Sequence, residues 1–524
     1  MKRIFKFFIL GTIALSTVSC EHFLDINENP NQAIESTPQQ VLPNALTNTA
    51  ATTVTYNDYG SWHVGYIVNA GGFGGWGSVL TYNYTTSDYN NLWSTAYDNL
   101  NDYKYIETTS QGKEELAYYD AIAKIMIAYN YQLLVDTYGD VPYTEALQGS
   151  NKVTPAYDKA DAIYQDLIAN KLDSALYLIN NSENAGAIKS GDVMFGGDMQ
   201  EWERFANTLK LKALVRISEV PSLASFVNQE FASFNATTKF LEEDAIVNPG
   251  YAASAGKQNP MWERYHSSAT GTAAGSGRSR IPSNFVLDFY DGTKIEDEAR
   301  GAVTYINFPK PPTNTLGDED ADAPTAPSNN IAWFVGAGTG SNAANTVGIF
   351  KGRSMGQPLM LAAESYFLLA EAYARGLLTG DDQAAFNTGI ERSFEYLYKN
   401  VNGNVESGYD PAGDAAAYIA ANAGEPLVDY TAAGSVEKKI EAIITQKYIA
   451  LNFIHGHEAW NEYRRTGYPA VTTGSTFASI KSASSRADKL PVRVLYPASE
   501  YQVNPKNAPS GVNAFNTPIF WDLD

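Results

Sequence analysis

The sequence predicts an all-α, mostly helical protein: a tetratricopeptide-like helical scaffold with one side built from long loops. In several segments apolar and aromatic residues recur at spacings of three and four, the period of a helix with one buried face. Strict alternation of apolar and polar residues, which would indicate strands, is scarce along the 524 residues. Long stretches rich in glycine, asparagine and aromatic residues interrupt the helical pattern.

The clearest predicted helix covers residues 113–136. Tyr119, Ile122, Met126, Tyr129 and Leu133 follow one another at three- and four-residue spacings, so they share one helical face. Gly139-Asp140-Val141-Pro142 should end this helix. The same spacing predicts helices over 359–376 and 440–451, with shorter ones over 158–180, 201–218 and 384–399. The mixture of small and aromatic residues in 363–376 resembles one tetratricopeptide-type unit, in which alanine lets a neighbouring helix approach.

Three stretches, at about 65–91, 249–283 and 306–348, are too long for ordinary connections. Loops of more than about 15 residues in a compact protein tend to be functional or disordered, and embedded aromatic residues favour function. Two of these stretches lie between helical blocks. We therefore expect a helical scaffold with one side built from these three loops.

The charge balance excludes one class of partner. The chain has 58 Asp and Glu against 37 Lys and Arg, a formal charge of −21. A basic face for nonspecific nucleic-acid binding is therefore not expected.

The N-terminus is typical of an exported protein. Lys2, Arg3 and Lys6 precede an apolar run over 7–18, which reads as a secretory signal segment and is too short for a bilayer core of ~30 Å. Ser16-Thr17-Val18-Ser19-Cys20 resembles a bacterial lipobox, although Thr17 stands where leucine is usual. An exported free thiol or another cleavage site are the alternatives. We expect a signal peptide over 1–19, lipidation of Cys20 and a lipidated tether over 20–38.

The loop aromatic residues suggest molecular recognition. A neutral sugar presents apolar C–H faces ringed by hydroxyl groups, so a receptor needs flat aromatic rings beside hydrogen-bonding side chains. The predicted ligand-binding residues are Trp62, His63, Trp76, Tyr82, Asn83, Trp262, Tyr265, Arg278 and Trp333, with Tyr84, Arg264 and Arg280 beside them. Taken singly, each of these side chains is more often a packing residue. Trp93, Trp202 and Trp460 lie on helical segments and are predicted core residues.

Six ordered segments resemble the SusD/RagB-like nutrient-binding outer-membrane lipoproteins of Bacteroidetes. Three lie in the first three quarters of the chain: Asp25 to Asn31, Asp136 to Ala146, and Ala363-Glu364-Ser365-Tyr366 leading into Ala370-Glu371-Ala372. The strongest are Gln446-Lys447-Tyr448, Glu458 to Pro469, and Tyr496 to Tyr501 followed by Asn504-Pro505. Most of these residues are expected to be structural, including Arg464 and Arg465, which can interact with Glu458 or Glu462.

The resemblance implies a single tetratricopeptide-containing helical domain over residues 39–524, with loop insertions at about 65–91, 249–283 and 306–348. It also implies a specific function. Such a protein is lipid-anchored in the outer membrane, faces the cell exterior, captures oligosaccharide and delivers it to a SusC-like TonB-dependent transporter. A peptide-binding receptor of the same family is the first alternative, because some relatives capture peptides.

A surface glycoside hydrolase is the alternative from a different class, but enzymatic patterns are weak. With 58 acidic residues some pair of carboxylates can always be proposed for glycoside hydrolysis, so numbers alone do not support it. His455 and His457 flank Gly456 without HExxH spacing, so we interpret them as turn or surface residues and not as metal ligands. No catalytic residue, metal or cofactor is expected.

Overall fold

The structure of the protein is a computed structural model that describes residues 36–188, 191–328, 331–338, 346–471 and 477–523. The predicted signal peptide and Cys20 lie outside these residues. The end of the predicted tether lies within the described residues. There, Thr37 caps a helix that begins at Pro38.

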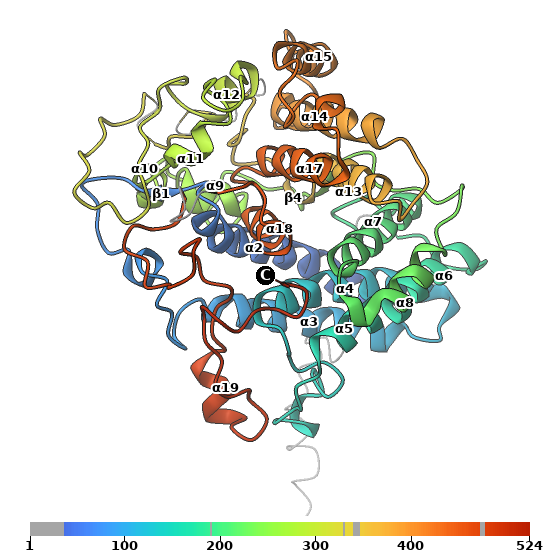
Figure 1. Cartoon of the computed structure of the whole chain (residues 1–524). Coiled ribbons are helices and arrows are strands. Elements are labelled where there is room, and N and C mark those ends of the chain that lie inside the picture. Colours follow the sequence, from blue (N-terminus) through green and yellow to red (C-terminus); the bar gives the residue numbers. More distant parts are fainter. Residues whose placement is uncertain (1–35, 189–190, 329–330, 339–345, 472–476, 524) are drawn as a thin grey trace, which may run out of the picture.

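The described chain is mostly helical, as the sequence predicts. Its first helical block contains α2 (Pro38–His63), α3 (Asn90–Ser110), α4 (Ala117–Tyr138), α5 (Ala160–Asp166), the π-helix η5 (Leu167–Leu172), α6 (Asp173–Asn181), α7 (Met199–Ile217) and α8 (Ala224–Phe231). The second contains α13 (Ala362–Ala374), α14 (Asp382–Tyr398), α15 (Pro411–Ala421), α16 (Tyr430–Ala433), α17 (Val436–Ala450) and α18 (Gly456–Thr466). Neighbouring pairs such as α3 and α4, or α13 and α14, pack against each other (Figure 1).

Short elements connect and flank these blocks. The single-turn helices are η2 (Gly77–Leu80), η3 (Glu114–Leu116), η4 (Gly149–Asn151) and η6 (Pro221–Leu223). The remaining helices are α9 (Pro260–Tyr265), α10 (Gly275–Ser279), α11 (Asn284–Leu287), α12 (Glu298–Thr304) and α19 (Ala498–Val503). Two small antiparallel sheets pair β1 (Val68–Asn69) with β3 (Arg280–Ile281), and β2 (Ala245–Val247) with β4 (Gln357–Met360).

The predicted helices are present, but three of them start at other residues than predicted: α4 begins at Ala117, α13 at Ala362 and α17 at Val436. Helix α4 ends at Gly139, whose φ of +77° suits glycine. Asp198 caps α7 by accepting hydrogen bonds from the backbone N–H groups of Gln200 and Glu201. The helix predicted over 359–376 begins only at Ala362, because Leu359 lies in β4 instead.

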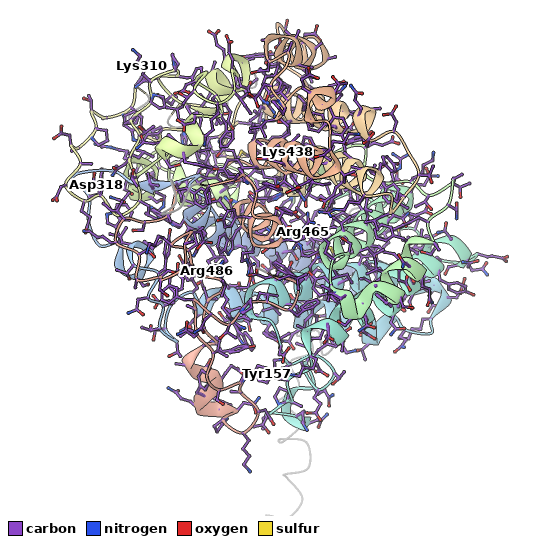
Figure 2. All side chains as sticks on the ribbon, in the orientation of Figure 1. Tyr157, Lys310, Asp318, Lys438, Arg465 and Arg486 are labelled. Atoms are coloured by element: carbon purple, nitrogen blue, oxygen red, sulfur yellow. The ribbon has the colours of Figure 1, made fainter. Side chains whose placement is uncertain are left out.

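Buried charges join the two blocks where α4, α7, α13, α17 and α18 meet. Arg216 of α7 donates hydrogen bonds to Glu458 and Glu462 of α18, at 2.7 and 3.1 Å. Arg465, which Figure 2 marks on α18, binds both carboxylate oxygens of Glu371 of α13 at 2.7 Å and also pairs with Glu462. Arg465 therefore pairs with an α18 glutamate as predicted, whereas the buried Arg464 donates to the carbonyls of Val492 and Asp136, at 2.9 and 2.7 Å.

Candidate functional site

The three long loops predicted from the sequence meet on one side of the molecule, which we call the loop face. In Figure 1 β1, α9, α10 and α11 gather there beside the yellow connection after α12. Strand β1 from the first loop pairs with β3 from the second, with Asn69 opposite Arg280. The third loop joins them through Trp333, whose indole N–H donates to the Arg278 carbonyl at 3.2 Å.

Asn69 holds the third loop against the first. Its buried side chain donates to the Asp318 carbonyl and accepts from the Gly317 N–H, both at 2.8 Å. Further along the first loop, Gly71 lies so close to the 321–322 backbone that an added Cβ would be 1.9 Å from the Ala321 carbonyl oxygen. Lys310 and Asp318 mark the outer edge of this third loop in Figure 2. Hydrogen bonds and close backbone contacts therefore hold the three loops against one another on the loop face.

A pair of tryptophans forms the aromatic part of this face. Trp62 lies near the end of α2, and Trp76 packs edge-on against it with a centroid distance of 5.6 Å. Trp62 is buried at 3% exposure, whereas Trp76 is partly exposed and its neighbour Phe73 is 38% exposed. The Trp76 indole N–H donates to the Phe73 carbonyl at 3.2 Å, which fixes the ring on its glycine-rich loop. Trp76 is thus a partly exposed ring that packs against the buried Trp62.

Polar groups lie directly beside these rings. Asp58, one helical turn before Trp62, accepts from Arg264 Nη2 at 2.7 Å and from the Tyr265 hydroxyl at 2.5 Å. The guanidinium of Arg280 lies over the Trp62 ring at 5.3 Å and over Tyr265 at 5.7 Å. Burial raises the pKa of Tyr265 and the nearby Asp58 raises it further, so the phenol stays protonated and donates. The Arg264 side chain remains 37% exposed.

His63 and Tyr82 are predicted ligand-binding residues that the structure buries. His63 is fully buried: its Nδ1–H donates to the Tyr59 carbonyl at 2.7 Å, and its Nε2 accepts from the Tyr84 hydroxyl at 2.7 Å. Tyr82 is also fully buried and accepts from the Ser479 N–H. Because their polar atoms and faces are used inside the protein, neither is an open platform in this structure.

Trp262 and Trp333 are likewise core residues. Trp262 is fully buried and stacks on His266 with a centroid distance of 3.6 Å. Trp333 is 2% exposed. Trp262 lies on the short helix α9, and both rings belong to the hydrophobic core. The predicted core tryptophans Trp93, Trp202 and Trp460 are indeed buried.

Of the predicted residues, the structure brings the buried Trp62 and Tyr265 together around Arg280, and Trp76 packs against Trp62. Asn83 and Arg278 are exposed on separate parts of the loops. Sequence reasoning missed Asp58 and did not single out Phe73. A usable signal for Asp58 was its place four residues before Trp62, which puts the two on one face of a helix.

The arrangement suits a ligand with an apolar face and polar edges. Trp76 can contact the face, and the arginines and Asp58 offer donors and an acceptor at the edge. Within the described residues, no group of three histidine, cysteine, aspartate or glutamate side chains is placed to hold a metal ion. His455 and His457, predicted as turn or surface residues, are buried. In the same part of the chain, each helix is too short or too polar to span a bilayer.

The protein is thus mostly helical, and its loop face carries the partly exposed Trp76 against the buried Trp62. The chain belongs to the SusD-like family, because the family profile described as "Starch-binding associating with outer membrane" matches residues 30–497. No curated protein is significantly similar to it in sequence.

Solved structures share the fold. A chitin-binding SusD homologue from Flavobacterium johnsoniae is 24% identical, with a TM-score of 0.65 over 92% of this chain and 99% of its own. A second structure, of a chitin-binding protein, is 23% identical, with a TM-score of 0.67 over 93% of this chain and 100% of its own. A SusD homologue from Bacteroides fragilis is 21% identical, with a TM-score of 0.64 over 90% of this chain and 95% of its own.

Proposed function

We propose that the protein is a cell-surface lipoprotein that captures oligosaccharide on the loop face. The observation that carries this proposal is the partly exposed Trp76 seated on Trp62, with Arg264, Arg280 and Asp58 beside it. Flat rings flanked by fixed hydrogen-bonding groups match the apolar faces and hydroxyl rims of sugars. The family description and the chitin-binding proteins of similar fold support the same ligand class.

Peptide capture is the runner-up within the family. A peptide in extended conformation would use main-chain hydrogen bonds along a sheet edge or a groove. On the loop face the adjacent β1 and β3 are only two residues long and pair with each other. An aromatic platform with charged edge groups therefore favours a sugar over a peptide.

The remaining parts of the proposal come from the family resemblance. Cys20 is the proposed lipid anchor, with the body outside the outer membrane. A SusC-like TonB-dependent transporter is the proposed recipient of the captured ligand. A tether near the transporter would raise the effective concentration of the binder at its partner. Glycoside hydrolysis is the contrasting function.

Native gels that contain single polysaccharides test the ligand class. Chitin-derived glycol chitosan, starch and a set of plant glycans can each be cast in a gel, with bovine serum albumin as a non-binding standard. The proposal predicts retarded migration in at least one gel and no new reducing ends after incubation. Release of reducing ends would favour the hydrolase. Normal migration in every gel, combined with binding to a peptide library, would favour the peptide receptor.

A further inference from the structure

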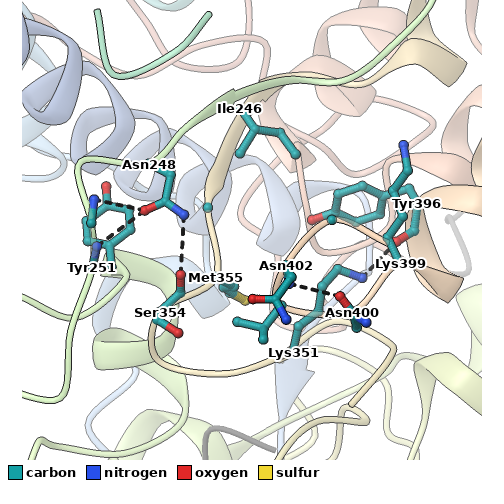
Figure 3. A pocket seen from close by; sticks show the side chains of 14 residues that line it. Ile246, Asn248, Tyr251, Lys351, Ser354, Met355, Tyr396, Lys399, Asn400 and Asn402 are labelled. Carbon is teal, nitrogen blue, oxygen red and sulfur yellow. Dashed lines mark hydrogen bonds between the residues drawn. The ribbon is translucent and has the colours of Figure 1, made fainter. Parts of the chain in front are cut away.

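A cavity separate from the Trp62 and Trp76 cluster opens beside the small sheet of β2 and β4. It has a volume of about 480 Å³ and is lined by the end of β2, the segment 351–356 before β4, and the turn after α14 (Figure 3). This volume falls within the range of small-molecule sites, roughly 300–1,000 Å³. It shares no lining residue with the Trp62, Trp76, Arg264 and Arg280 cluster.

Lys351 brings an ammonium group to this cavity. Its side chain is 6% exposed, and Figure 3 shows Nζ beside Tyr396, Lys399 and Asn400. Nζ donates to the carbonyls of Gly348 and Tyr396, at 2.9 and 2.7 Å. An ammonium has three N–H groups, and the third has no acceptor among the described residues. Two carbonyl dipoles do not neutralise a buried charge, so Lys351 is suited to receive an anion.

The neighbouring Lys399 forms its ion pairs with other residues that do not include Lys351. Lys399 lies 3.0 Å from Glu243, 3.4 Å from Asp244 and 2.9 Å from Glu395. Within the described chain, no carboxylate lies within 4 Å of Lys351 Nζ, although Asp244 attracts it from farther away. Burial lowers the pKa of Lys351 to about 7; Asp244 opposes this shift and Lys399 adds to it.

A second unsatisfied polar group lines the same cavity. Tyr251 is 8% exposed, and its hydroxyl has no hydrogen-bond partner in the described structure. Asn248 shapes this wall, because its Oδ1 accepts from the N–H groups of Gly250 and Tyr251, at 3.0 and 3.3 Å. Ile246 and Met355 add apolar surface. The cavity thus combines a cation, a free hydroxyl and an apolar wall.

We propose that this cavity binds a small hydroxylated carboxylate of the sugar-acid class, with its carboxylate at Lys351 Nζ and a hydroxyl group at Tyr251. The carboxylate would supply the acceptor and the counter-charge that Lys351 lacks. A ring hydroxyl would satisfy the Tyr251 phenol, and the ring carbons would lie against Met355 and Ile246. The proposal is independent of glycan binding at Trp76.

D-glucuronate is the probe and D-glucose is its neutral counterpart, both titrated by calorimetry into the full mature chain. We expect saturable binding of glucuronate and at least tenfold weaker binding of glucose. Lys351→Met should weaken glucuronate binding at least tenfold, and Tyr251→Phe about threefold or more. Lys438→Met is the matched control, because this lysine lies exposed on α17 and pairs only with Glu441 among the described residues. The Lys438→Met variant should therefore bind glucuronate with the wild-type affinity.

Equal affinity for glucose and glucuronate, no saturable binding of glucuronate, or unchanged affinity in Lys351→Met would each overturn the proposal. Thermal melts show whether each variant folds. If Lys351→Met does not fold, amine acetylation of the wild-type chain followed by mass spectrometry gives the answer. Glucuronate should then slow acetylation of Lys351 and leave Lys438 unaffected, whereas equal labelling of Lys351 with and without glucuronate contradicts the site.

Discussion

Arg216 Nη2 donates a 2.7 Å hydrogen bond to Glu458 Oε2, and this contact joins α7 to α18 in the protein interior. Arg216 also pairs with Asp136 of α4, whose Oδ1 accepts from the Trp521 indole N–H at 2.9 Å. Lys212 lies 2.6 Å from the other Glu458 oxygen. Two segments that resemble the family motifs, Asp136 to Ala146 and Glu458 to Pro469, therefore meet in one ionic network, which explains these charged residues as structural.

Replacing Glu458 should destabilise the fold severely. Burial alone would raise the pKa of Glu458, but Lys212 and Arg216 lower it well below its usual range, so the side chain is ionised. Glu458→Gln would leave two buried cations short of a counter-charge, and losing one partner of a buried pair costs about 3–5 kcal/mol. Urea unfolding followed by circular dichroism measures the change.

Lys438→Gln serves as the comparison for Glu458→Gln, because it removes an exposed partner from the Lys438 and Glu441 pair. Its unfolding midpoint should match that of the wild type, since exposed ion pairs contribute little. A Glu458→Gln midpoint equal to that of Lys438→Gln would show that the buried network does not stabilise the fold.

His63 should make stability depend on pH. Burial lowers the pKa of His63 to about 3; the Tyr59 carbonyl opposes the shift and Arg464 adds to it. Between pH 6.5 and 3 the unfolded chain binds a proton at this side chain while the folded chain does not, so the free energy of unfolding falls as the pH falls. The slope from one such group is at most about 1.4 kcal/mol per pH unit.

His63→Gln removes this titration, so the difference in unfolding free energy between wild type and variant should shrink from pH 7 to pH 4. The comparison isolates His63, because His457 and His266, whose pKa values burial also lowers, are present in both proteins. Parallel stability curves for the two proteins across this range would mean that His63 binds its proton over the same pH range in the folded and the unfolded chain.

Cys20 is predicted to anchor the mature chain. With Cys20→Ala, the protein should leave the outer-membrane fraction and should no longer be released by protease from intact cells, because the acyl chains that hold it are lost. Cell fractionation and surface proteolysis measure both properties. A variant that still fractionates with the outer membrane and is still cleaved on intact cells would disprove lipid anchoring at this cysteine.

The helices were predictable because the residues of each buried helix face recur along the sequence at spacings of three and four. The spacing identified α4, α7, α14 and α17, but it could not place the start of α13, where Leu359 takes part in a strand whose partner lies more than a hundred residues earlier. Local patterns hold no information about such distant pairing.

The candidate site was predictable only in part, for the same reason. Whether a loop aromatic is a platform or a core residue depends on partners from other segments, such as Ser479 for Tyr82 or the Arg278 carbonyl for Trp333. The Lys351 cavity was missed entirely because its walls come from three separate segments. Trp76, a predicted ligand-binding residue, is partly exposed in the structure, and the glycines on either side of it carry no side chains that could cover its ring.

Titration calorimetry of Trp76→Ala tests glycan binding at the loop face most directly. The titrant is an oligosaccharide of the polysaccharide that retards the wild-type protein, with chitohexaose tried first. Trp76→Ala should bind about 5–150-fold more weakly, which corresponds to the loss of about 1–3 kcal/mol for an aromatic platform, without a large loss of thermal stability. Tyr177→Ala removes a 67% exposed ring from α6, far from the loop face in Figure 1, and should bind like the wild type. Equal affinity in Trp76→Ala and the wild type would contradict glycan binding at this surface.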